Sequence, residues 1–117
     1  MPSQDDKILN QMNKKEKIEN EFQETHNKII QTIKDRKRSE KEYLDIIKKQ
    51  KKYWEGQLEN TDPEKNKDRY NHLKENIKRE ENLIIQIKEE LNRIDEQFKM
   101  EKEHQKIEEE HIKGNKT

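Results

Sequence analysis

The spacing of apolar residues in the second half of the chain sets the strongest limit on its fold. Large apolar side chains recur there at intervals of three and four residues, with one interval of seven. They are Tyr70, Leu73, Ile77, Ile84, Ile87, Leu91, Ile94 and Phe98. Such a repeat puts every side chain on one face of a helix and is typical of a coiled coil. We therefore expect a long helix that packs lengthwise against another helix.

The first half of the chain follows the same heptad less regularly. Its first core position holds Leu9, Ile30, Leu44 and Leu58, and its second holds Met12, Ile33, Ile47 and Trp54. No apolar side chain occurs from residue 34 to residue 42. Good helix formers fill that stretch without Gly or Pro, so we expect it to stay helical.

One internal proline divides the chain. Thr61 or Asp62 can cap a new helix, Pro63 suits its first position, and Glu64 favours the positive end of its dipole. An alternative is one long helix that pairs in a parallel dimer, but a proline inside a helix costs about 3 kcal/mol. We therefore predict an all-α fold, an elongated antiparallel helical hairpin (a coiled coil) with its turn near residues 60–64, packed on further helices of a partner.

The predicted hairpin is a single domain of residues 1–117. Helix one covers about 4–59, the turn 60–63, helix two about 64–112, and a frayed tail 113–117. Folding the chain about Asp62 pairs Trp54 with Tyr70, Ile47 with Ile77, Ile33 with Leu91, Ile30 with Ile94 and Met12 with Ile112. The predicted intrachain seam is Ile33, Ile47, Trp54, Tyr70, Ile77, Leu91, Ile94 and Phe98. His26 falls at a seam position opposite Phe98.

Composition argues against an enzyme. Charged residues make up 46% of the chain, apolar residues only 25%, and the net charge is zero, which is too lean for an ordinary globular core. Two isolated glycines cannot form a phosphate loop, and no cysteine is available for a thiolate zinc site. His104 and His111 lie two turns apart, so a metal site would need ligands from another helix. We expect no enzymatic activity, no cofactor and no metal site.

A second apolar line runs along helix one, one position before the first core position. Its members are Ile8, Phe22, Ile29 and Tyr43. A stripe this wide exceeds what one partner helix covers. We expect helix one to contact a protein partner as well, in a homodimer or a hetero-complex. The leading hypothesis is a non-enzymatic coiled-coil interaction protein, a small structural or adaptor subunit of a larger intracellular assembly such as a cytoskeletal one.

Basic residues concentrate in the second part of helix one. The set is Arg36, Lys37, Arg38, Lys48, Lys49, Lys51 and Lys52, with Tyr53 and Trp54 following. Such a patch suits a solvated face with ion pairs, an acidic protein surface, or a phosphate backbone. Zero net charge makes nucleic acid the least favoured partner. No apolar run is long enough for a membrane span, and the start MPSQDDK has no secretory or organellar pattern, so we expect a cytoplasmic protein without membrane contact.

Residues Tyr43, Gln50, Leu58, Asp62-Pro63 and Leu73, with the regular apolar positions up to Phe98, resemble tubulin-binding cofactor A. Members of that family are small helical chaperones that hold β-tubulin on a three-helix bundle. The resemblance covers about residues 30–98, and this chain departs from it in its long arm before Ile29 and in its acidic C-terminal extension. It implies an alternative function, a chaperone that holds an unassembled acidic client such as tubulin through Lys48–Lys52.

Overall fold

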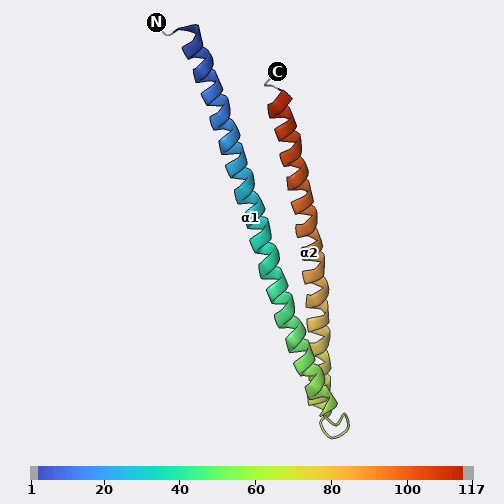
Figure 1. Ribbon diagram of the computed structural model, residues 1–117. Coiled ribbons are helices and arrows are strands. Elements are labelled where there is room, and N and C mark those ends of the chain that lie inside the picture. The colour runs from blue at the N-terminus through green and yellow to red at the C-terminus, as the bar shows by residue number, and fades with distance from the viewer. Residues whose placement is uncertain (1–2, 115–117) are drawn as a thin grey trace. The chain divides into compact units, whose positions relative to one another are not determined.

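The computed structural model describes residues 3–114, which form two helices joined by a turn (Figure 1). Helix α1 covers Gln4–Glu59 and helix α2 covers Lys67–Gly114. The described residues contain no strand. The predicted all-α helical hairpin is confirmed, and residues 34–42 are helical as expected. Residues 113 and 114 belong to α2, and the rest of the predicted frayed tail lies outside the described residues.

The turn is longer than predicted, because an extra helical turn precedes α2. Oδ1 of Asp62 accepts hydrogen bonds from the backbone N–H groups of Glu64, at 2.9 Å, and Lys65, at 3.3 Å. The N–H of Asn66 then donates to the carbonyl of Asp62 at 3.0 Å. Asp62 thus caps this short turn, and α2 begins only at Lys67, three residues after the predicted start.

The chain divides into two compact units, which we describe separately. The turn unit covers Asp35–Glu96. The terminal unit combines α1 up to Lys34 with α2 from Gln97 onward. Each unit contains a segment of α1 beside an antiparallel segment of α2.

A small apolar cluster fills the centre of the turn unit. Leu44, Ile47 and Ile87 are buried, and Leu83, Ile84 and Leu91 pack against them. Ion pairs lie beside this cluster, with Nζ of Lys37 2.6 Å from Oδ1 of Asp95 and Nζ of Lys51 3.6 Å from Oε1 of Glu81.

The alignment of the helices in the turn unit differs from the predicted one. A fold symmetrical about Asp62 puts residue 87 opposite Lys37, yet Lys37 pairs with Asp95. Ile47 packs in the cluster of Ile87, and its predicted partner Ile77 is not part of that cluster. The longer turn accounts for the difference, since α2 starts later and each of its residues therefore meets a later residue of α1, nearer the turn, than predicted.

The terminal unit shows the same displacement. Ile112 was predicted to face Met12, but it lies with Glu19, Phe22 and Gln23 around a shallow groove. Met12 is 61% exposed and Leu9 is 55% exposed, although both occupy core positions of the heptad. The predicted pairing of Met12 with Ile112 is therefore wrong.

Burial of the predicted seam is uneven. Ile33, Ile47 and Ile94 are buried, with Ile94 only 1% exposed. The other predicted seam residues are half-buried, namely Trp54, Tyr70, Ile77, Leu91 and Phe98. Within the described residues, neither helix is long and apolar enough to cross a membrane.

Candidate functional site

The predicted partner line on α1 is largely open to solvent. Ile8 is 49% exposed, Ile29 38% and Tyr43 44%. Phe22 differs from them, because it is half-buried and packs edge-on against the ring of His26, with ring centres 4.6 Å apart. Three of the four predicted residues are therefore accessible to another protein, and Phe22 belongs at least partly to the interior of the terminal unit.

Sequence reasoning missed a second set of exposed apolar residues on the same helix. Ile18, Ile46 and Tyr53 are more than half exposed. In the turn unit, Ile46 stands three residues after Tyr43, and Tyr53 stands seven residues after Ile46. This spacing puts the three side chains on one side of α1. The signal was present in the sequence as a second run of three- and four-residue intervals, 43, 46, 50 and 53, beside the main heptad.

The position between Ile46 and Tyr53 on this face is uncharged. Residue 50, which completes the spacing between Ile46 and Tyr53, is a glutamine. The ring of Tyr53 lies 5.1 Å from that of Trp54, so the exposed tyrosine continues into a half-buried tryptophan. We call Tyr43, Ile46 and Tyr53 the outer face of the turn unit.

Ion pairs within the chain occupy more than half of the predicted basic patch. Arg36 pairs with Glu90 and Lys37 with Asp95, both on α2. Arg38 pairs with Asp35, and Lys51 lies 3.5 Å from Glu55 and 3.6 Å from Glu81. Lys48, Lys49 and Lys52 form no ion pair in the part of the chain that the structure describes. The patch that remains for a partner is therefore these three lysines.

Glu90 is shared by two arginines from different helices. Nε of Arg93 donates to its Oε2 at 2.9 Å, and Arg36 contacts its Oε1. The hydrogen bond from Arg93 and the positive charge of Arg36 hold the pKa of the Glu90 carboxyl below its usual value, although partial desolvation opposes them. This arrangement favours the ionised carboxylate and has the form of a structural ion-pair network.

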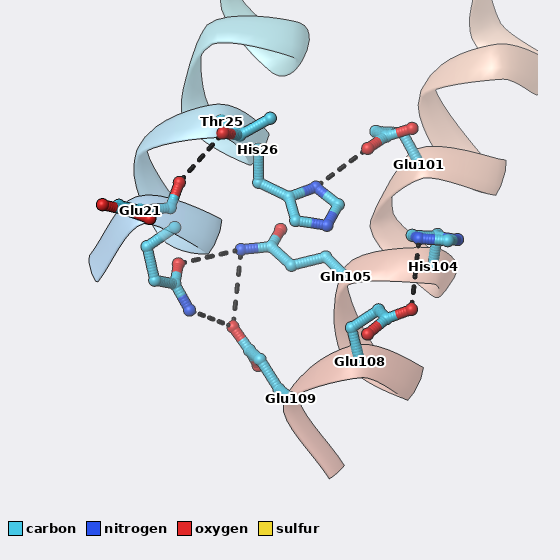
Figure 2. Close-up of polar contacts among 9 residues, drawn as sticks. Glu21, Thr25, His26, Glu101, His104, Gln105, Glu108 and Glu109 are labelled. Carbon is cyan, nitrogen blue, oxygen red and sulfur yellow. Dashed lines mark hydrogen bonds and ion pairs between the residues drawn. The ribbon is translucent and has the colours of Figure 1, made fainter. Parts of the chain in front are cut away.

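The seam of the terminal unit is polar where a coiled coil is usually apolar. His26 is only 3% exposed, and its Nδ1 lies 2.9 Å from Oε1 of Glu101 (Figure 2). Four residues after Glu101 on α2, the side-chain amide of Gln105 donates to Oε1 of Gln23 at 3.3 Å. The amide of Gln23 donates to Oε1 of Glu109 at 2.8 Å. The fold about Asp62 places His26 opposite Phe98. In the structure the shifted alignment of α2 places it opposite Glu101 instead.

The described residues contain no cluster of side chains that could hold a metal ion. Among residues 3–114, no three His, Asp or Glu side chains are arranged around a common point as they are around a bound ion.

Comparison of the chain with protein-family models, with curated proteins and with solved structures finds no match in any of the three. The resemblance to tubulin-binding cofactor A therefore rests on the quoted residues alone.

Proposed function

We propose that this protein is a non-enzymatic interaction protein, a small structural or adaptor subunit that binds another helical protein through the solvent side of α1. The observation that carries the proposal is the exposure of apolar residues on a helix whose other side already packs against α2. Tyr43 is 44% exposed, Ile46 53% and Tyr53 59%. Large apolar side chains grouped on one helix face are typical of an interface that a partner covers.

The chemistry of the outer face suits a helix rather than an extended peptide. Its side chains follow three- and four-residue intervals, which is the pattern that a second helix matches with its own core positions. Two of them are tyrosines, which bury apolar ring area while keeping a hydroxyl at the wet rim. Lys49 lies four residues before Tyr53, at the border of this face, and forms no ion pair within the described chain. We therefore expect the partner helix to carry acidic residues beside its apolar stripe.

The test is the mass of the complex that the chain forms in a cell extract. The variant Tyr43→Lys with Ile46→Lys puts two charges on the outer face, and Ile85→Lys is the matched control, because Ile85 is 55% exposed on α2. Sedimentation of labelled wild type and of the Ile85 variant should give a complex heavier than the 14.5 kDa chain, and the double variant should sediment as the free chain. The proposal fails if wild type is a free monomer, or if the double variant keeps the complex while its helical circular dichroism is unchanged.

A second candidate is a chaperone that holds an acidic client through Lys48, Lys49 and Lys52. These lysines favour it because they have no acidic partner within the described chain. Exposed charges are screened by salt, with a Debye length of about 8 Å at physiological ionic strength. A client held mainly by these lysines would dissociate as salt is raised, whereas a partner on the outer face would stay bound. Raising the salt in the same sedimentation experiment separates the two functions.

A further inference from the structure

One serine of α1 differs from the other serines and threonines in having a free hydroxyl. The Oγ1 atoms of Thr25, Thr32 and Thr61 each donate to the backbone carbonyl four residues earlier, at 2.7–2.9 Å. Oγ of Ser3 accepts a hydrogen bond from a backbone N–H at 3.3 Å. Among the serines and threonines of residues 3–114, only Ser39 has a hydroxyl without a hydrogen bond, and it is exposed. Its oxygen is therefore accessible to an enzyme from solution.

Three basic residues directly precede this serine, namely Arg36, Lys37 and Arg38. Both arginine side chains are more than half exposed. Each of the three forms an ion pair within the chain, but exposed ion pairs contribute little to stability and are readily exchanged. No other serine or threonine of the described chain follows a basic residue within three positions. An enzyme with acidic groups beside its active site therefore distinguishes Ser39 from the others by charge.

The segment that contains Ser39 has no apolar side chain of its own from residue 34 to residue 42. It contacts α2 through the ion pairs of Arg36 with Glu90 and of Lys37 with Asp95. Segments with few buried apolar contacts open at a lower free energy than the core. This part of α1 can therefore open locally without exposing apolar side chains of its own, which an enzyme that takes an extended substrate segment requires.

Ser39 also continues the spacing of the outer face. Residues 43, 46, 50 and 53 follow intervals of three, four and three, and Ser39 lies four residues before Tyr43. Side chains four residues apart on a helix are neighbours, with Cβ atoms about 5–6 Å apart. A group attached to the Ser39 hydroxyl therefore lies at one end of the outer face.

We propose that Ser39 is phosphorylated by a protein kinase that selects basic residues before the serine, and that the phosphate releases the partner of the outer face. The release rests on the proposed function. In the transfer, Oγ of Ser39 bonds to the γ-phosphorus of ATP, the bond from that phosphorus to the oxygen of ADP breaks, and the hydroxyl proton passes to a base of the kinase. The phosphate brings about two negative charges. Beside Tyr43 these charges oppose burial of the ring and repel the acidic residues expected on the partner helix.

The site is tested by incubating the purified full chain with ATP, Mg²⁺ and a purified kinase that selects arginine three residues before the serine. Mass spectrometry of the intact chain and of its peptides locates the phosphate. We expect one phosphate per chain, at Ser39, and none in Ser39→Ala. Absence of phosphate from the wild-type chain, or phosphate mainly at another residue, would overturn the assignment.

Recognition by charge is tested with two arginine variants. Arg36→Gln should be phosphorylated at least about tenfold more slowly than wild type, because it loses hydrogen bonds between charged groups. Loss of the pair with Glu90 eases opening of the segment, so a slower reaction reports lost recognition and not a tighter helix. Arg79→Gln, on the exposed side of α2, is the matched control and should react like wild type. Equal rates for the two variants would contradict recognition through Arg36.

Release is tested by sedimentation in cell extract with phosphatase inhibitors present. The unphosphorylated chain should form the heavier complex, the phosphorylated chain should sediment alone, and kinase-treated Ser39→Ala should keep the complex. A phosphorylated chain that stays in the complex overturns the release and leaves the proposed function intact. Absence of a complex for the unphosphorylated chain overturns the proposed function and the release with it, while mass spectrometry alone decides the phosphorylation of Ser39.

Discussion

His26 of α1 and Glu101 of α2 face each other within the terminal unit, with Nδ1 2.9 Å from Oε1. The imidazole is 3% exposed, and the rings of His26 and Phe22 pack edge-on with their centres 4.6 Å apart. Polar residues inside a helix seam lower stability but distinguish one helix alignment from others a turn away. Glutamines 23 and 105 continue this layer, so the polar residues of the terminal unit help to set the level at which α1 meets α2.

Replacement of His26 should be costly in spite of its polarity. His26→Ala leaves a hole beside Phe22 and removes the edge-on ring contact, so we expect the free energy of unfolding to fall by about 1–3 kcal/mol. His111→Ala changes an exposed ring and should stay within about 0.5 kcal/mol of wild type. Urea unfolding followed by circular dichroism measures both. Equal stability of the two variants would contradict the burial of His26.

Two residues that both occupy core positions of the heptad should differ strongly in how much their replacement by alanine lowers stability. Ile94 is 1% exposed and Met12 is 61% exposed, although both hold core positions. Ile94→Ala should cost about 2–5 kcal/mol, whereas Met12→Ala should change the unfolding free energy by no more than about 0.5 kcal/mol. Urea unfolding of the two variants tests the alignment of the helices, because a pairing of Met12 with Ile112 about Asp62 would give Met12→Ala a substantial cost as well.

The cap at the turn can be tested by a conservative rescue. Asp62→Ala removes the acceptor for the N–H groups of Glu64 and Lys65 and should lower stability by about 0.5–2 kcal/mol. Asp62→Asn keeps a side-chain oxygen in the same place and should retain nearly all of the wild-type stability. Thermal melts of both variants decide the point. A loss in Asp62→Asn as large as that in Asp62→Ala would show that the charge, and not the cap, matters.

The ion pairs of Glu90 predict that part of the stability of the turn unit depends on pH in the acid range. Its folded-state pKa is depressed by the hydrogen bond from Arg93 and the charge of Arg36. The resulting stabilisation is fully present above the ordinary carboxyl pKa of about 4.3 and is lost as the pH falls through the depressed folded-state value. Carbon NMR titration of the side-chain carboxyl should give Glu90 a midpoint below the ordinary carboxyl pKa. In Arg93→Gln that midpoint should rise toward the ordinary value, and an unmoved midpoint would contradict the assignment of Arg93 as the main cause.

The sequence contains enough to predict the two helices and the turn, because heptad spacing and a single capped proline leave few alternatives. The spacing alone does not determine which residues of α1 lie opposite which residues of α2. A shift of α2 by one heptad still places apolar residues opposite apolar residues. Asp62 is one of the two caps that the sequence predicts, but the length of the turn that it caps, which places the start of α2 at Lys67, does not follow from that prediction. The outer face was found only in part for a similar reason. Tyr43 belongs to the predicted partner line, whereas the sequence analysis gives Ile46 no role and names Tyr53 only beside the basic patch.

Site-specific photo-crosslinking in cells tests the central claim most directly. A benzophenone side chain in place of Tyr43 reports any protein that covers the outer face, whether a second copy or a different chain, and the same group at Ile85 of α2 is the control. The proposed function predicts a discrete covalent product of higher mass from position 43 and none from position 85. Absence of a product at position 43, or the same products at both positions, would contradict the claim that the outer face of α1 is an interface.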